Sequence, residues 1–132
     1  MFPVHLRTKK IMDDCNIEIS NNVVMTDPLG YKDFIGLIAS SKLVLTDSGG
    51  VQEEAAVLNI PCLILRDTTE WMAYVEAGKN MIIGTDSEKI IDSVNDLLSN
   101  PEKIEDMKNI KIQIEDNPSK MIVSTLKKNL KN

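Results

Sequence analysis

The chain has 132 residues, 42% of them hydrophobic and 27% charged, and its 15 basic and 20 acidic side chains leave a net charge of -5. This length predicts one folded domain, and the composition excludes disordered, collagen-like and mucin-like chains. The acidic balance excludes the positive surface that a nucleic-acid backbone requires, so we expect no nucleic-acid partner.

The N-terminal segment, residues 1–7, lacks a charged leader followed by a long apolar core, and no stretch approaches the roughly 20 apolar residues that cross a bilayer. We therefore expect a cytoplasmic chain without a membrane partner. Cys15 and Cys62 form no CxxC motif, and the chain has 1 histidine. We expect two free thiols, no metal site and no cofactor.

Short apolar runs rich in β-branched residues alternate with polar turns and with longer stretches of helical spacing, a pattern typical of successive βα units. The expected strands are Phe2–Val4, Asn22–Met25, Leu43–Thr46, Pro61–Leu65 and Met81–Ile83. The expected helices are Thr8–Asp14, Tyr31–Ser41, Val51–Leu58, Trp71–Ala77, Ser87–Ser99, Glu102–Lys108 and Ser119–Asn129. Because most strands are continuously apolar, the pattern predicts an α/β fold with a parallel sheet covered by helices on both faces.

Several helix ends carry their own signals. Gly78 is expected to end one helix, and Asp86 or Ser87 to cap the next. The last helix carries a broad apolar stripe, which suits docking on an apolar surface. The stripe consists of Met121, Ile122, Val123, Leu126 and Leu130. The opening strand lacks the elements that normally precede an inner strand of such a sheet, which suggests a fragment.

The strongest local feature is a strand that runs into two glycines and then into a helix, over Leu43–Glu54. Gly49 and Gly50 let the backbone come close to a ligand, and the N–H groups of a helix start favour an anion, usually phosphate. Ser48 adds a hydroxyl donor, and Glu54 is near enough to accept hydrogen bonds from the hydroxyls of a ribose attached to those phosphates. The alternative is an ordinary tight βα turn whose carboxylate interacts with the helix dipole.

A second polar turn, over residues 65–70, again follows an apolar strand and precedes a helix. Two local roles would also explain these residues. Thr68 or Thr69, together with Glu70, would cap the following helix, and Arg66 would form a local ion pair with Asp67. Both turns would nevertheless open at the C-terminal edge of one parallel sheet, which is where open α/β sheets bind ligands.

The single histidine, His5, ends the first apolar run and is followed by Arg7, at the same predicted edge. A lone histidine is more often structural than catalytic, although this position favours a role in a site. Phe34 lies on a helix beside other apolar residues, and its periodicity places it in the core unless a base stacks on it.

Several separated motifs resemble the non-hydrolysing UDP-N-acetylglucosamine 2-epimerases in order and spacing. They are His5–Thr8, Leu45–Ala55, Pro61, Leu65–Glu70, Val75–Gly78 and Gly84–Asp86. The resemblance covers nearly the whole chain but only the C-terminal half of the family. It implies a Rossmann-like half of a glycosyltransferase-B type fold. Residues 1–132 would be the single UDP-binding domain, with the N-terminal catalytic half absent.

The resemblance also implies roles for individual residues. Ser48, Gly49 and Gly50 would bind the diphosphate, and Glu54 the ribose hydroxyls. Phe34 would line the uracil side of the pocket, and His5 would be the catalytic residue beside the diphosphate. Further candidates for binding UDP or a UDP-hexosamine are Arg7, Arg66, Thr69 and Glu70.

In the family, UDP is eliminated across the C1–C2 bond of the sugar and then added back, which inverts C2 and converts UDP-N-acetylglucosamine to UDP-N-acetylmannosamine. Removing the C2 proton needs a base, and departure of UDP needs neutralisation of its charge. The acid and base carboxylates of the family belong to the N-terminal half, so we expect the isolated chain to bind UDP without turnover.

The chain also departs from the family pattern. Trp71-Met72-Ala73 replaces Arg-Pro-Glu, which removes a cation expected near the nucleotide. A modified UDP-hexosamine, for example a diacetamido-uronic acid, therefore stays open as an alternative sugar. Leu6 stands in place of proline, and the glycine-rich loop after Asn117-Pro118 is deleted.

Two alternatives stay open. One is a non-catalytic UDP-sugar module, or the subunit of a split epimerase that joins a separate N-terminal chain. The other is the donor half of a UDP-dependent glycosyltransferase. A homodimer is also expected, because truncation would leave apolar surface uncovered.

Overall fold

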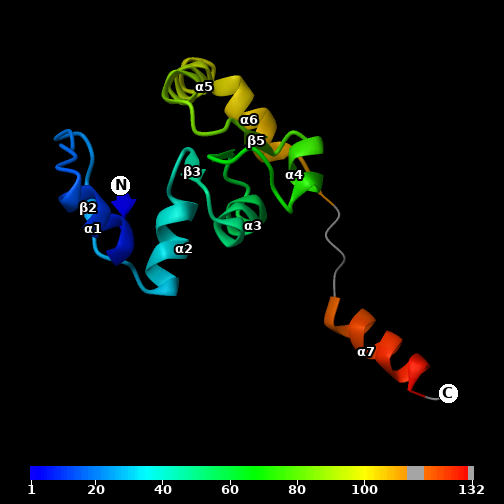
Figure 1. Ribbon diagram of the computed structural model, residues 1–132. Coiled ribbons are helices and arrows are strands. Elements are labelled where there is room, and N and C mark those ends of the chain that lie inside the picture. The colour runs from blue at the N-terminus through cyan, green and yellow to red at the C-terminus, as the bar shows by residue number, and fades with distance from the viewer. Residues whose placement is uncertain (113–117, 131–132) are drawn as a thin grey trace.

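A computed structural model of the chain describes residues 1–112 and 118–130. Helices and strands alternate along most of it (Figure 1). The strands are β1 (Phe2–Pro3), β2 (Met25–Thr26), β3 (Val44–Thr46), β4 (Cys62–Ile64) and β5 (Asn80–Ile82). The helices are α1 (Leu6–Asp14), α2 (Tyr31–Ala39), α3 (Gly49–Val57), α4 (Met72–Glu76), α5 (Ser87–Ser99), α6 (Pro101–Asn109) and α7 (Pro118–Asn129). None of the helices in this part of the chain is long and apolar enough to span a membrane.

The strands form two parallel sheets. β1 pairs with β2, with Phe2 opposite Met25. The other three follow the order β3-β4-β5, with Leu45 opposite Leu63 and Leu63 opposite Met81. The parallel α/β class is confirmed.

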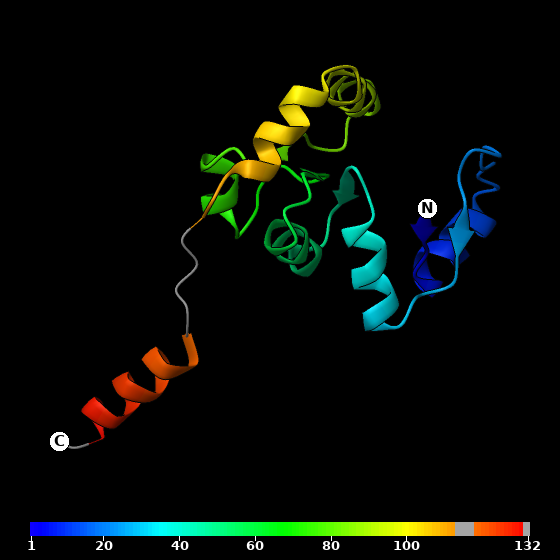
Figure 2. The same ribbon diagram turned by 180° about the vertical axis from the view of Figure 1, so that it is seen from behind.

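The expectation of one continuous sheet is wrong for the described residues. β1 and β2 have only two residues each, and α2 lies between their sheet and β3 in both views (Figures 1 and 2). An apolar run predicts that a strand exists, but pairing between strands is decided by contacts distant in the sequence, which the run does not contain.

The central strand β4 is covered by helices on both faces, as predicted. Cys62 and Ile64 are fully buried in a cluster that includes Ile38 of α2 and Ala55 of α3. Leu63, between them, points to the opposite face. There it joins a second cluster, which consists of Leu63, Ile83, Leu97, Ile104 and Met107 and thereby includes residues of α5 and α6. This alternation is the two-residue period of a strand.

The predicted helix signals are confirmed. Asp86 caps α5, because its Oδ1 accepts a hydrogen bond of 2.9 Å from the backbone N–H of Lys89. Gly78 follows α4 with a φ of 83°, a left-handed conformation that glycine adopts without strain, and its N–H donates to the carbonyl of Val75.

Lys79, directly before β5, is buried with 3% of its surface exposed. Its Nζ donates to Asn59 Oδ1 at 2.6 Å and to the carbonyl oxygen of Ile110 at 2.8 Å. The ammonium group therefore ties the segment after α3 to the end of α6. Burial lowers the pKa of Lys79.

The apolar stripe of α7 is not covered by the described residues. Its members, Met121, Ile122, Val123, Leu126 and Leu130, are 48 to 82% exposed. Docking of this helix on an apolar surface is therefore not seen within this part of the chain. Asn117, after which the glycine-rich loop of the family is expected to be missing, lies outside the described residues.

Candidate functional site

The N-terminus of α3 keeps its first backbone donors free of a side-chain cap. Ser48 is the N-cap residue, but its hydroxyl makes no capping hydrogen bond. Instead, the Ser48 N–H donates to Thr46 Oγ1 at 3.1 Å, which shapes the turn between β3 and α3. The first N–H groups of a helix have no partner within the helix, so α3 offers them to an anion.

The two glycines at this helix start differ in their surroundings. A Cβ on Gly50 would meet nothing within 4 Å, so this side of the helix start faces open space. A Cβ on Gly49 would collide with the Glu70 carboxylate oxygen Oε1 and would lie 3.5 Å from Trp71 Nε1. Gly49 therefore lies against the turn after β4, and a larger residue there would have to displace the end of the Glu70 side chain.

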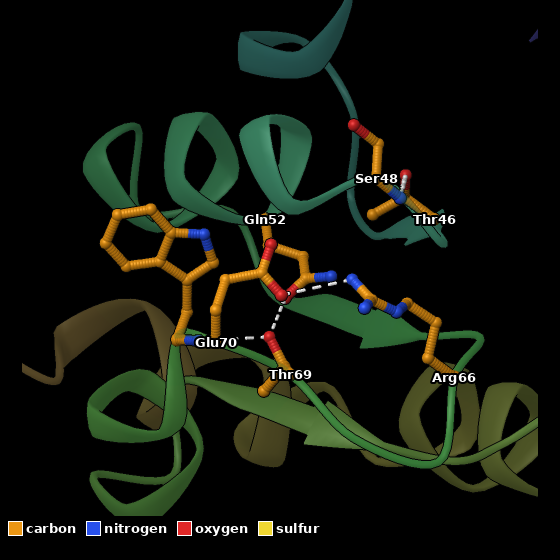
Figure 3. A network of polar contacts seen from close by, with 7 residues as sticks. Thr46, Ser48, Gln52, Arg66, Thr69 and Glu70 are labelled. Carbon is orange, nitrogen blue, oxygen red and sulfur yellow. Dashed lines mark hydrogen bonds and ion pairs between the residues drawn. The ribbon is translucent and has the colours of Figure 1, made fainter.

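The turn after β4 is held by three polar contacts (Figure 3). Arg66 Nη1 pairs with Glu70 Oε2 at 3.1 Å, and both side chains are partly exposed. The Thr69 hydroxyl donates to Gln52 Oε1 on α3 and accepts the backbone N–H of Trp71 at 3.1 Å. The predicted meeting of the two turns at one sheet edge is confirmed, since β3 and β4 are adjacent and parallel.

This geometry corrects the local alternatives for the second turn. The partner of Arg66 is Glu70 and not Asp67. The N-cap residue of α4 is Trp71, which makes no side-chain capping bond. Thr69 instead faces α3, so its role is to join two elements that are distant in the sequence.

Gln52 is a site residue that the sequence reasoning missed. It is fully buried on α3, and its Nε2 has no hydrogen-bond partner among the described residues. The only signal was its place in the run from the glycines to Glu54, because helical periodicity does not reveal that a glutamine will be enclosed by a neighbouring loop.

Glu54 and Phe34 take no part in these polar contacts. Glu54 is half-buried on α3, and no described residue hydrogen-bonds to its carboxylate. Phe34 is half-buried on α2 and packs against the cluster that contains Ala55 and Cys62. Phe34 therefore lies at the margin of the core, on the side that its periodicity predicts, and part of its surface stays exposed.

His5 and Arg7 do not join this constellation in the structure. His5 caps α1, with its Nδ1 accepting the Arg7 backbone N–H at 3.2 Å, and both side chains are exposed. The strand before His5 belongs to the two-stranded sheet, so the expectation that His5 shares the edge of β3 and β4 is wrong for this sheet arrangement.

Nothing in residues 1–112 and 118–130 groups three or more His, Cys, Asp or Glu side chains as a metal site would. A hollow of about 430 Å³ lies at the other end of α3, lined by Leu58, Asn59, Ile60, Lys108, Asn109 and Lys111. None of the candidate residues lines it. The candidate site is therefore the donor-rich start of α3 together with the turn after β4.

The family model for UDP-N-acetylglucosamine 2-epimerase matches residues 1–127. The chain belongs to this family. The resemblance seen in the separated motifs is thereby confirmed.

Two epimerases illustrate the similarity. A UDP-N-acetylglucosamine 2-epimerase of Neisseria meningitidis is 40% identical over 132 residues, which is 98% of this chain and 35% of that protein. The enzyme of the same name from Methanocaldococcus jannaschii is 41% identical over 103 residues, which is 75% of this chain and 28% of that protein. This chain therefore spans about a third of the length of these relatives.

Solved structures agree with the fold. The Neisseria meningitidis UDP-GlcNAc 2-epimerase bound to UDP-GlcNAc matches with a TM-score of 0.75 at 40% identity, over 96% of this chain and 35% of that one. A co-structure of S. aureus MnaA with UDP matches with a TM-score of 0.82 at 29% identity, over 98% of this chain and 36% of that one. The assignment to the Rossmann-like, glycosyltransferase-B type fold of these epimerases is confirmed.

Proposed function

We propose that residues 1–132 form the UDP-binding, C-terminal half of a UDP-N-acetylglucosamine 2-epimerase. The observation that carries this proposal is the start of α3, where uncapped backbone N–H groups lie beside the open space at Gly50. Such donors, strengthened by the helix dipole, suit the oxygens of a diphosphate. Relatives of known structure were solved with UDP and with UDP-GlcNAc, which supports the same ligand here.

The proposed roles follow the chemistry of each group. Ser48, Gly49 and Gly50 bind the diphosphate through the hydroxyl and the backbone donors. The carboxylate of Glu54 has no competing hydrogen bond among the described residues and accepts from the ribose hydroxyls. Phe34, from the neighbouring helix α2, lines the uracil side.

The proposed reaction of the complete enzyme is elimination of UDP and its re-addition. A base removes the C2 proton while the C1–O bond to UDP breaks, which gives a glycal. UDP then adds back to C1 as a proton returns to the opposite face of C2. This chain stabilises the charge on the departing UDP. The role proposed for His5 at the reaction centre rests on its motif in the family, because in the structure His5 caps α1 and does not lie beside the start of α3.

The acid and base carboxylates are proposed to come from the N-terminal half, as a joined or separate chain. Without them, the 132-residue chain binds UDP and does not turn over. The exposed apolar stripe of α7 supports assembly with that half or with a second copy. Sedimentation at several concentrations distinguishes the second copy, and recovery of epimerisation on addition of the N-terminal half distinguishes a split enzyme from a non-catalytic module.

The sugar that follows UDP is a separate question, because Trp71-Met72-Ala73 replaces a family Arg-Pro-Glu. A UDP-2,3-diacetamido-2,3-dideoxy-D-glucuronate 2-epimerase of Pseudomonas aeruginosa is 40% identical over 93 residues, which is 70% of this chain and 26% of that protein. This relative supports a diacetamido-uronic acid as the second candidate for the sugar.

The decisive experiment is calorimetric titration of UDP into the purified chain. We expect saturable binding that weakens in Ser48→Ala and in Glu54→Ala. Ser99→Ala, at the exposed end of α5, and Glu18→Ala, in an exposed loop, are the matched controls and leave the affinity unchanged. Absence of UDP binding by a folded wild-type chain would refute the proposal.

A further inference from the structure

The carboxylate of Glu70 occupies the space directly over the first residue of α3. A Cβ on Gly49 would collide with Glu70 Oε1 and would lie 3.0 Å from the carboxyl carbon. Gly49 is the first residue of α3, a nine-residue helix. The chain thus places one of its own anionic groups at the helix start where the phosphates of UDP are proposed to bind.

Two neighbours keep Glu70 in this place. Arg66 Nη1 pairs with its Oε2 at 3.1 Å. The preceding residue, Thr69, is buried and hydrogen-bonded to Gln52 of α3, which fixes the backbone on which Glu70 lies (Figure 3). The ion pair therefore holds the carboxylate of Glu70, and the buried Thr69 holds the backbone next to it.

A second observation concerns the polar groups buried beneath this junction. Gln52 is fully buried on α3, and its Oε1 is used by Thr69. Its Nε2, however, has no acceptor among the described residues. A buried amide donor without an acceptor is rare in native proteins. Asn80 Oδ1 is likewise buried without a partner in the described part of the chain, and Asn80 Nδ2 donates to the Gln52 carbonyl at 3.5 Å, so the polar contacts beneath the start of α3 are not all satisfied.

We propose that Glu70 is an internal competitor of the diphosphate. The carboxylate leaves the start of α3 when the diphosphate binds, and Arg66 exchanges its bond to Glu70 for a bond to a phosphate oxygen. A carboxylate and a phosphate are both anions, so the N-terminus of α3 and Arg66 serve either one, and the two cannot occupy the same space. This inference rests on the proposed UDP site and describes how that site is regulated.

The test compares UDP with uridine, because uridine lacks the competing phosphates. Glu70→Gln and Glu70→Ala should bind UDP roughly three- to tenfold more tightly than the wild type, since removing the occupant raises the fraction of chains competent to bind. Both variants should bind uridine with the wild-type affinity. Asp67→Asn is the matched control, because it removes one negative charge from the same exposed loop, and it should leave the UDP affinity unchanged.

A fluorescence readout reports the exchange itself. Trp71 is the single tryptophan of the chain, and its Nε1 lies 3.5 Å from the Cβ position of Gly49. We expect UDP to shift its emission in the wild type, and Glu70→Ala to shift it in the same direction without ligand. In an Arg66→Gln background, the gain from Glu70→Gln should shrink, because the cation that is exchanged is no longer present.

The outcomes separate the two proposals. If the folded wild type and the folded Glu70 variants bind neither UDP nor uridine, the proposed UDP site is refuted, and the proposed competition by Glu70 is refuted as well. If UDP binds but Glu70→Gln and Glu70→Ala leave its affinity unchanged or weaken it, the competition is refuted and the UDP site stands. An equal gain from Asp67→Asn would also refute it, because general charge would then explain the effect.

Discussion

The hydroxyl of Thr69 donates a hydrogen bond to Oε1 of Gln52, and this bond joins the turn after β4 to the first half of α3. The two residues are 17 positions apart and both are buried. The same hydroxyl accepts the backbone N–H of Trp71. One side chain therefore sets the distance between the two turns that form the candidate site.

Replacing Thr69 by valine should test this link. Valine keeps the shape but leaves Gln52 Oε1 and the Trp71 N–H without their partner, so we expect a loss of about 1–3 kcal/mol in the free energy of unfolding. We also expect weaker UDP binding, because the turn is no longer fixed against α3. Urea unfolding and calorimetry measure the two effects. Thr68→Val, at the exposed neighbouring position, should change neither quantity, and an equal loss there would contradict the assignment.

The sequence predicted the elements well because their signals are local. Continuous apolar runs identified each of the five strands to within a few residues, and Asp86 and Gly78 marked helix ends through contacts made within one turn. Which strands pair is not a local property. The separation of β1 and β2 from β3 was therefore not predictable from the runs themselves.

The site was predicted in part, for the same reason. The glycines and Ser48 follow a strand and open a helix, so their place at a helix start could be inferred from the sequence. The position of Glu70 over Gly49 depends on how two loops fold against one another, as does the burial of Gln52. Neither fact is encoded in a spacing, and both appear only in the folded chain.

Gly50→Ala should separate binding from folding. Alanine at Gly50 meets no neighbouring atom and replaces glycine within a helix, so we expect a gain of roughly 0.5–1 kcal/mol in stability. The added methyl group nevertheless projects into the open space in which the diphosphate is proposed to bind. The expected result is a more stable chain with lower affinity for UDP.

Gly36→Ala is the control for this substitution. Gly36 also lies within a helix, and a Cβ there also meets nothing within 4 Å, but the helix is α2 and no proposed phosphate contact involves Gly36. It should raise the thermal midpoint in a similar way without any change in UDP affinity. If Gly50→Ala binds UDP as well as Gly36→Ala does, the phosphates do not approach Gly50.

Lys79→Met should loosen the end of the fold opposite the candidate site. The ammonium group is buried with two acceptors, Asn59 Oδ1 and the Ile110 carbonyl, which would both lose a charged donor. Hydrogen bonds to charged groups contribute about 1.5–3 kcal/mol, and we expect a loss of stability of that order, measured by urea unfolding. Lys111→Met, at a nearby exposed position, should change stability by less than about 0.5 kcal/mol. Comparable losses of stability in the two variants would show that the hydrogen bonds of Lys79 make no specific contribution.

The two cysteines should differ sharply in reactivity. Cys15 is exposed, whereas Cys62 is fully buried in β4, and burial raises the pKa of the Cys62 thiol from 9.0 to about 12. The reactive species is the thiolate, so iodoacetamide at pH 8 should label Cys15 in the folded chain and Cys62 only after unfolding. Mass spectrometry of the labelled peptides measures this difference, and rapid native labelling of Cys62 would contradict the structure.

The raised pKa of Cys62 also makes stability depend on pH. Between pH 9 and about 12 the unfolded chain releases the thiol proton while the folded chain retains it, so the contribution of Cys62 is complete below pH 9 and is lost as pH rises through this range. The slope approaches about 1.4 kcal/mol per pH unit. Burial and the nearby Glu53 raise the pKa of Tyr74, which acts in the same direction, while the lowered pKa of Lys79 acts in the opposite one.

Cys62→Ala keeps both of these groups, so its unfolding free energy, measured by urea titration at each pH, should fall less steeply than that of the wild type. Cys15→Ala should keep the full slope, and equal slopes in all three proteins would show that the thiol of Cys62 titrates normally in the folded chain.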